Sequence, residues 1–274
     1  MTPLHVVAAI FWADELAELF FDVNAELGQR VAIDARDKSD RTPLQLAVAS
    51  WNPNAVRFLL DRGADPSNFV FSTESYFVMG WPRCPNETHD HFKLRQTSGA
   101  LIIVQLLEQR GYELDRGAAL TIMRHFARYH MLKTLADYNA THEFFGTSDL
   151  DEYRYDDEFA SEAKKITIVP GLSLYDLIQL PTEEAENRVG YEDYFEFARS
   201  GKLFQDRQIE VSHVACVARL CELITRRFFR RWSLDPFWEL IHKRLPLEIC
   251  EMILDRLGVK DLCSICLAAA GPNS

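Results

Sequence analysis

The chain has 274 residues, of which 47% are hydrophobic, so it can form one large domain or two small ones around a sizeable core. Its formal net charge of −11 argues against nucleic acid as a partner, because phosphate binding requires a basic surface. Six cysteines are too few for a disulfide framework here, which favours a cytoplasmic location, with the nucleus also open. The apolar run Ala100–Leu107 is too short to span a bilayer, so no membrane association is expected.

A four-residue sequence motif at the start of the chain is repeated further along, and both copies are called the Thr-Pro phrase. Thr2-Pro3-Leu4-His5 recurs as Thr42-Pro43-Leu44-Gln45, and a second apolar helical segment follows each copy, at Asp14–Phe20 and Ala55–Leu60. Thr can cap a helix by accepting from a free backbone N–H, and Pro at the first helical position lacks a donor that has no partner there. The phrase therefore predicts two helix pairs, the second of which ends at Gly63 in the left-handed conformation.

This pattern resembles the ankyrin repeat, and the second copy is close to the family consensus. The matching positions are Arg41-Thr42-Pro43-Leu44, Ala47, Val56, Leu59-Leu60 and Gly63-Ala64-Asp65. The family repeats at about 33 residues, whereas Thr2 and Thr42 are 40 apart. We place the extra residues in Asn24–Ile33, before a turn segment at Asp34–Asp37. Gln45 stands where the family has histidine, which weakens one hydrogen bond at most.

Because a solenoid needs roughly three repeats or more, degenerate copies are expected after the first two. Ser98–Arg110 resembles a second repeat helix, and Phe71–Gln96 is then the altered first half of that third copy. Gly117–Tyr129 and Met131–Leu135 resemble a fourth copy without its Thr-Pro. We therefore expect about four ankyrin repeats over residues 1–140.

An acidic connector is expected over residues 141–170. Gly146–Glu158 is rich in carboxylates and tyrosines, and we interpret it as solvated, with an acidic recognition tract as the alternative. Short helices are expected after it, in Gly171–Ile178 with a Ser cap, from Pro181, and over Asp193–Arg199.

The segment Ile209–Trp232 has a strongly helical period. Its apolar side is formed by Val211, Val214, Val217, Leu220, Leu223 and Ile224. Four arginines crowd its end, namely Arg226, Arg227, Arg230 and Arg231. We interpret them as charges placed favourably near a helix C-terminus. The alternative is that they bind an acidic partner or the acidic middle of the chain.

A further amphipathic helix is predicted from Leu245 to Leu257. Pro246 stands at its start, Gly258 ends it, and another helix begins at Asp261. The segment resembles the beginning of an F-box, which reads Leu-Pro-x-Glu-Ile, then Ile-Leu-x-x-Leu, a break, and Asp-Leu. Ankyrin repeats followed by a truncated C-terminal F-box-like element are the architecture called PRANC. It is found in poxvirus ankyrin proteins and in relatives from parasitoid wasps and intracellular bacteria.

The resemblance implies an all-α fold, in which an ankyrin solenoid precedes a small helical F-box-like PRANC domain at residues 171–274. Leu174-Tyr175-Asp176-Leu177 resembles the opening motif of that domain. The implied function is a substrate-recruiting adaptor of a cullin–RING (SCF-type) ubiquitin ligase, used in host modulation. The F-box-like stripe that is implied to bind the Skp adaptor comprises Leu245, Pro246, Leu247, Ile249, Ile253, Leu254 and Leu257. The ankyrin positions implied to bind an unidentified protein target are Arg36, Asp37, Lys38, Asp40, Arg41, Trp51 and Asn52.

A second hypothesis is an ankyrin module that acts by sequestration, for example of a Rel-type transcription factor, without ligase recruitment. The two hypotheses differ in whether the Leu245–Leu257 stripe is exposed or is buried against the Ile209–Trp232 helix. The sequence holds no phosphate loop, nucleophile elbow or metalloprotease helix, so neither an enzyme nor a cofactor is expected. Cys263 with Cys266, and Cys84 with His89 and His91, lack further ligands, so no metal is expected.

Overall fold

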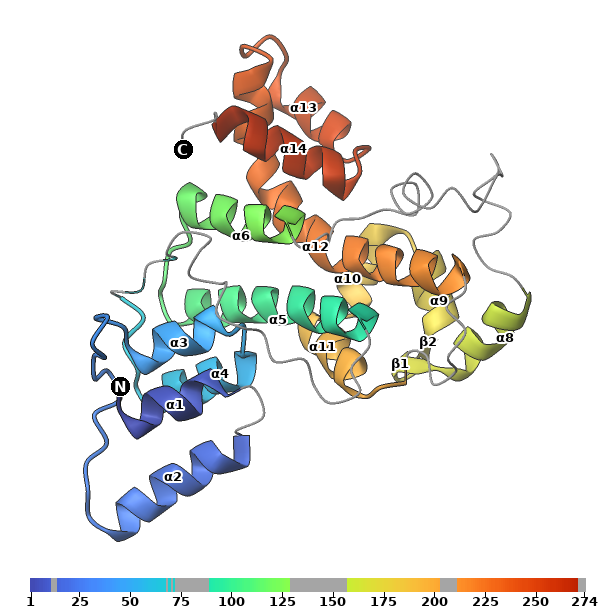
Figure 1. Cartoon of the computed structure of the whole chain (residues 1–274). Coiled ribbons are helices and arrows are strands. Elements are labelled where there is room, and N and C mark those ends of the chain that lie inside the picture. The colour runs from blue at the N-terminus through green and yellow to red at the C-terminus, as the bar shows by residue number, and fades with distance from the viewer. Residues whose placement is uncertain are drawn as a thin grey trace. The chain divides into compact units, whose positions relative to one another are not determined.

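A computed structural model of the chain describes residues 1–10, 14–67, 69, 71, 89–128, 157–202 and 211–270 (Figure 1). These residues are mostly helical, and the regular structure among them that is not helical is one short hairpin, which agrees with the all-α class. The chain forms two compact units, one of residues 1–84 and 99–121, the other of residues 85–98 and 122–274. None of the helices in the described ranges combines the length and the apolarity that crossing a membrane requires.

The first unit is built on the two Thr-Pro phrases. Its first four helices, blue in Figure 1, are α1 (Pro3–Ala9), α2 (Asp14–Glu26), α3 (Pro43–Ala49) and α4 (Pro53–Asp61). Thr2 and Thr42 are the N-cap residues of α1 and α3, and a proline follows each of them, as predicted. The Thr42 hydroxyl accepts the N–H of Gln45 at 3.2 Å, as expected of a cap, whereas the Thr2 hydroxyl bonds the His5 ring at 2.7 Å instead. Helix α1 packs on α3 and α2 packs on α4, so the two copies stack as successive layers. Their shared core includes the fully buried Leu4, Leu44 and Val56.

The first copy differs from the second mainly in the length of its outer helix. Gly28 and Gly63, both with positive φ, follow α2 and α4, but Gly28 is 26 residues after Thr2 and Gly63 only 21 after Thr42. Five of the extra residues therefore precede Gly28, and four of these lengthen α2 to 13 residues against nine in α4. The extra residues, placed in Asn24–Ile33 from the sequence, thus partly form an additional helical turn of α2.

Helices α5 (His89–Gln109) and α6 (Arg116–Arg128) each contribute to both units. The predicted third-copy helix is only the second half of α5, which already begins at His89, so His89–Gln96 does not form a separate first helix. The exit loop of α5 turns at Gly111, whose φ is 86°, and Tyr112 packs edge-on against Phe69. The expected helix at Gly117–Tyr129 is present as α6, whereas residues 129–140 lie outside the described ranges.

The second unit contains the rest of the helices and the hairpin. Its elements are α8 (Asp157–Lys165), β1 (Thr167–Val169), β2 (Leu172–Ser173), α9 (Leu174–Gln179), α10 (Thr182–Arg188), α11 (Tyr191–Arg199), α12 (Val211–Leu240), α13 (Leu247–Leu254) and α14 (Val259–Ala270). Strands β1 and β2 pair antiparallel around Gly171, which has a φ of 80°. The Ser173 hydroxyl accepts the N–H of Asp176, which confirms the predicted Ser cap of α9.

Two expectations about this unit need correction. Residues 157–170 are not connector, because α8 packs on α9 and buries Phe159 and Ala163; residues 141–156 lie outside the described ranges. Helix α12 does not end at Trp232 but continues to Leu240, with Pro236 inside it. The continuation brings α12 alongside α13 and α14, which pack on it.

Candidate protein-interaction surfaces

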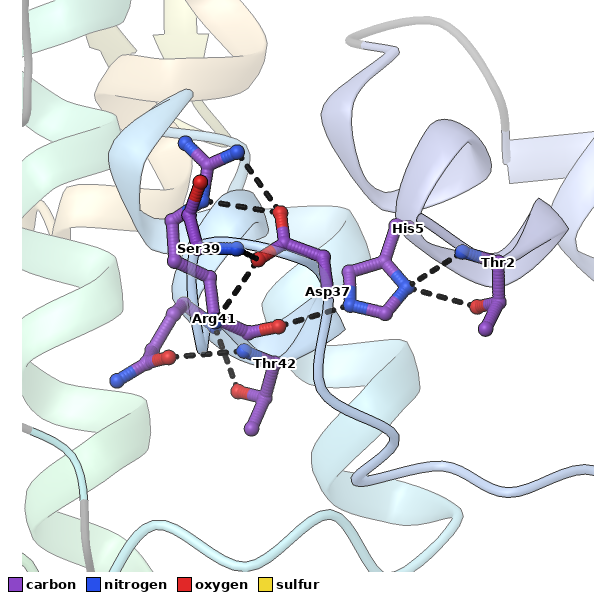
Figure 2. A network of polar contacts seen from close by, with 7 residues as sticks. Thr2, His5, Asp37, Ser39, Arg41 and Thr42 are labelled. Atoms are coloured by element: carbon purple, nitrogen blue, oxygen red, sulfur yellow. Dashed lines mark hydrogen bonds and ion pairs between the residues drawn. The ribbon is translucent and has the colours of Figure 1, made fainter.

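His5 links the two stacked helix pairs of the first unit. Its Nδ1 atom accepts from the backbone N–H of Thr2 at 3.1 Å, and its Nε2 donates to the backbone oxygen of Arg41 at 2.8 Å (Figure 2). The imidazole is fully buried, so both bonds are shielded from water. In the next layer, Gln45 accepts from the N–H of Thr42 at 2.8 Å, which preserves the bond within the cap. The His5 bridge therefore fixes the start of the second repeat against the first.

The turn before α3 is held by one carboxylate. Asp37 accepts from the backbone N–H groups of Ser39 (2.8 Å) and Arg41 (3.0 Å), and from the Arg41 guanidinium at 2.8 Å (Figure 2). The side-chain bond from Arg41 is the main reason that the pKa of Asp37 lies well below its usual range, and the two backbone bonds add to it. Asp37 and Arg41 thus shape the turn tip, and their charged groups are engaged with each other.

The remaining expected target-binding residues divide into exposed and buried ones. Arg36, Lys38 and Asp40 are exposed at the tip, where Arg36 pairs with Asp40 at 2.8 Å. Trp51 and Asn52, in contrast, are each only 1% exposed. The expectation that these two reach a target is corrected, because both side chains belong to the core.

Trp51 and Asn52 are buried because the α3–α4 turn points its side chains inwards. Trp51 has a φ of 45°, a conformation that a bulky residue adopts only when its surroundings hold it there. Asn52 caps α4 by accepting the N–H of Ala55 at 3.1 Å, and it donates to the backbone oxygen of Ile10 at 3.2 Å. Asn52 thus joins the second layer to the first.

Helix α13 and the residues beside it carry the apolar stripe Leu245–Leu257, and only part of that stripe is exposed. The exposed large apolar side chains of this segment, between 37% and 57% accessible, are Leu245, Leu247, Ile249 and Met252. Ile253 and Leu257 are half-buried, and Leu254 is fully buried together with Cys250. Leu254 is therefore corrected from a surface position to a core position. Met252 was not among the expected binding residues, although its place in the apolar period could have indicated it.

The exposed side of α13 also carries charge, and its start is held in place. Pro246 is exposed at the N-cap position, and Glu248 and Glu251 lie exposed among the apolar side chains. Trp238 of α12 donates from its indole N–H to the backbone oxygen of Leu245 at 3.1 Å. The segment is thus an accessible apolar surface with acidic side chains beside it. The bond from Trp238 fixes the backbone just before α13.

Arginines of α12 hold the other end of α13. Arg226 donates to the backbone oxygens of Asp255 and Leu257, and Arg230 donates to the Asp255 carboxylate at 2.6 Å and to the backbone oxygen of Glu251 at 3.3 Å. The Asp255 and Leu257 carbonyls lie just beyond the end of α13, and the Glu251 carbonyl also accepts the N–H of Asp255, so the arginines reinforce the helix end and the turn that follows it. Arg226 and Arg230 do lie at a helix C-terminus, as expected. That terminus belongs to α13 and not to α12, the helix that carries the arginines.

The cysteines of the second unit are part of its core. Cys263 and Cys266 are buried on α14, and burial raises the pKa of the Cys263 thiol to about 12. His125 is also buried, which lowers its pKa to about 3 and keeps the imidazole neutral. Within the described residues no group of three or more His, Cys, Asp or Glu side chains is arranged to hold a metal ion. Cys84 and the His89 side chain lie outside the described part.

Comparison with known families identifies one element of the chain. A family model of the ankyrin repeat matches residues 39–69, which include α3 and α4 and begin two residues after Asp37. No curated protein and no solved structure matches the chain. An ankyrin repeat is a protein-interaction module, so a protein is the expected kind of partner.

Proposed function

We propose, starting from the ankyrin repeat at residues 39–69, that this chain is a substrate-recruiting adaptor of a cullin–RING ubiquitin ligase. In this proposal the second unit is F-box-like and of the PRANC type, and α13 docks on the Skp adaptor. The ankyrin unit binds the protein to be modified, and ubiquitin transfer takes place elsewhere in the complex. The chain positions its target and performs no chemistry itself.

The observation that carries the proposal is the exposed apolar group on α13. Covering Leu247, Ile249 and Met252, which are 41–57% exposed, would gain roughly 0.7–1.5 kcal/mol for each side chain, about half the value for burying a fully exposed one. Adjacent exposed apolar side chains of this kind mark a site for a protein partner. Docking of a helix through apolar side chains at intervals of three and four residues is a common recognition mode.

The second supporting observation is that α13 is held at both ends. Trp238 bonds the segment before the helix, and Arg226 and Arg230 bond the segment after it. A surface that is already ordered loses less conformational entropy on binding, which favours affinity. Under the sequestration hypothesis the stripe has no partner outside the chain, and its apolar side chains would be buried against α12. The exposure of Ile249 and Met252 favours the adaptor over that alternative.

The experiment is co-elution of the purified full chain with a Skp–cullin complex on size-exclusion chromatography. The proposal expects a single peak that contains all the components. It also expects that Leu247→Asp, at an exposed position, removes the chain from this peak without changing its circular dichroism. Ile253 and Leu257 are poorer positions, because their half-buried side chains support the fold. A folded parent chain that elutes separately would leave sequestration by the ankyrin unit as the function.

A further inference from the structure

Helix α2 carries a row of apolar side chains that no described residue covers. The row consists of Leu16, Leu19, Val23 and Leu27, which are between 42% and 65% exposed. Their spacing of three, four and four residues places them along one side of the helix. The N–H of Leu27 donates to the backbone oxygen of Val23 at 3.0 Å, so the helical geometry continues to the end of the row.

The corresponding side of α4 is covered by α2. When the two helices are aligned at their first residues, Leu16 corresponds to Ala55 and Leu19 to Phe58. Both α4 residues are half-buried, and the Phe58 ring meets the Phe21 ring of α2 edge-on at 5.3 Å. The α2 row thus lies on the side of α2 that is equivalent to the side of α4 on which α2 itself packs. This equivalence indicates that the missing cover is itself a helix.

The charge of α2 specifies what kind of helix fits. Glu18, Asp22 and Glu26 are exposed at intervals of four residues and form an acidic ridge beside the row. The full helix DELAELFFDVNAE has five carboxylates and no basic side chain. A second copy of α2 would add five more carboxylates to the contact, which like-charge repulsion disfavours. A partner with lysines or arginines beside its apolar residues matches both the row and the ridge.

We propose that the α2 row binds a basic amphipathic helix of a partner protein, laid on α2 as α2 lies on α4. The partner's apolar side chains cover the row, and its cationic side chains meet the ridge. This surface is separate from α13 and from the turn tips, so it does not depend on the adaptor function. The ankyrin unit then has two docking regions, one at its turns and one at this helix.

The test uses the full chain and a fluorescent synthetic peptide of Leu, Lys and Ala. The peptide has Leu at positions i, i+3, i+4 and i+7 with Lys on the flanks, and a scrambled peptide of the same composition is the comparison. Fluorescence anisotropy is expected to show binding of the patterned peptide alone. Leu16→Ser and Leu19→Ser should each weaken it about tenfold, since a lost apolar contact of this size is worth about 1.4 kcal/mol. The matched control Leu240→Ser, at a site 41% exposed, should leave binding unchanged.

Charge is tested with a matched pair of triple variants. Glu18→Gln with Asp22→Asn and Glu26→Gln should weaken binding of the patterned peptide and reduce the effect of salt on its affinity. Asp157→Asn with Glu158→Gln and Glu183→Gln changes the net charge equally at other exposed sites and should have little effect. Equal binding of the scrambled peptide, or equal losses in both triple variants, would overturn the proposal. Self-association of the chain that Leu19→Ser abolishes would overturn it as well, because the occupant would then be a second copy.

Discussion

Arg226 of α12 donates from its guanidinium to the backbone oxygen of Leu257, beyond the end of α13. A second bond joins Arg226 to the backbone oxygen of Asp255 at 2.6 Å, and Arg230 pairs with the Asp255 carboxylate at the same distance. One helix therefore supplies the capping groups of another. The orientation of the exposed side of α13 depends on these two arginines.

Arg226→Met is expected to lower the free energy of unfolding by about 1.5–3 kcal/mol, the usual contribution of hydrogen bonds from a charged group. Methionine keeps much of the apolar stem, so the change isolates the guanidinium. Urea unfolding followed by circular dichroism measures the loss. Arg227→Met at an exposed neighbouring position is the control, with an expected change of less than about 0.5 kcal/mol. Equal stability of the two variants would show that the Arg226 bonds do not hold α13.

His5→Ala is expected to cost about 2–3 kcal/mol of stability, because it removes two bonds and leaves the Arg41 oxygen without its donor. His5→Gln can keep the bond to the N–H of Thr2, as Gln45 does at Thr42, and should cost about 1 kcal/mol. Thermal unfolding of both variants measures the difference. Similar losses in both would indicate that the cavity, and not the bridge between layers, determines the effect.

The turn carboxylate Asp37 makes the first unit sensitive to acid. Its folded-state pKa is depressed, so its stabilising contribution is fully present above the ordinary value of 3.8 and is lost as pH falls below it. Asp37→Asn should therefore be less stable than the parent at neutral pH, and the gap should narrow below about pH 4. Melting temperatures of both proteins across this range measure the gap. A gap that is constant with pH would contradict the role assigned to the carboxylate.

Asn52→Ala tests the assignment of this residue to the core. The variant loses the cap of α4 and the bond to Ile10, and about 2 kcal/mol of stability should be lost with them. Lys38→Ala at the exposed tip should change stability by less than about 0.5 kcal/mol. Chemical unfolding compares the two. If Asn52→Ala is as stable as Lys38→Ala, the buried bonds of Asn52 contribute nothing measurable.

The helix starts of the ankyrin unit were predictable because their causes are local. Thr2 and Thr42 occupy the N-cap positions of the helices that follow them, and the proline after each favours the start through its fixed φ and missing donor. The same holds for the Ser173 cap of α9 and for the Gly63 turn. In each case the residues that determine the structure are within a few positions of one another.

What could not be predicted depends on contacts between distant segments. Pro236 would normally end a helix, yet α12 continues past it, and neighbouring α13 and α14 pack on this helix. Trp51 looked like an exposed turn residue because the sequence does not reveal that its turn points inwards. Arg226 has its partners 29 and 31 residues away, so sequence alone placed it beside the wrong helix end.

The apolar stripe of α13 was predictable from the sequence in its period but not in which of its residues are exposed. Its apolar period was visible in the sequence, and Ile249 is accessible as the docking hypothesis requires. Leu254 belongs to the same period but is fully buried, on a helix that packs on α12. A helix with apolar residues on two sides gives one pattern, and only tertiary packing decides which side is covered.

Calorimetric titration of a purified Skp adaptor into the full chain tests whether α13 docks on that adaptor. We expect a Kd on the order of 1 μM for the parent and for Val6→Asp, a matched change at an exposed apolar site that is 47% accessible. Ile249→Asp should weaken binding at least about tenfold, because the contact would desolvate an unpaired carboxylate. Absence of binding by the folded parent, or equal binding by Ile249→Asp, would contradict the adaptor function.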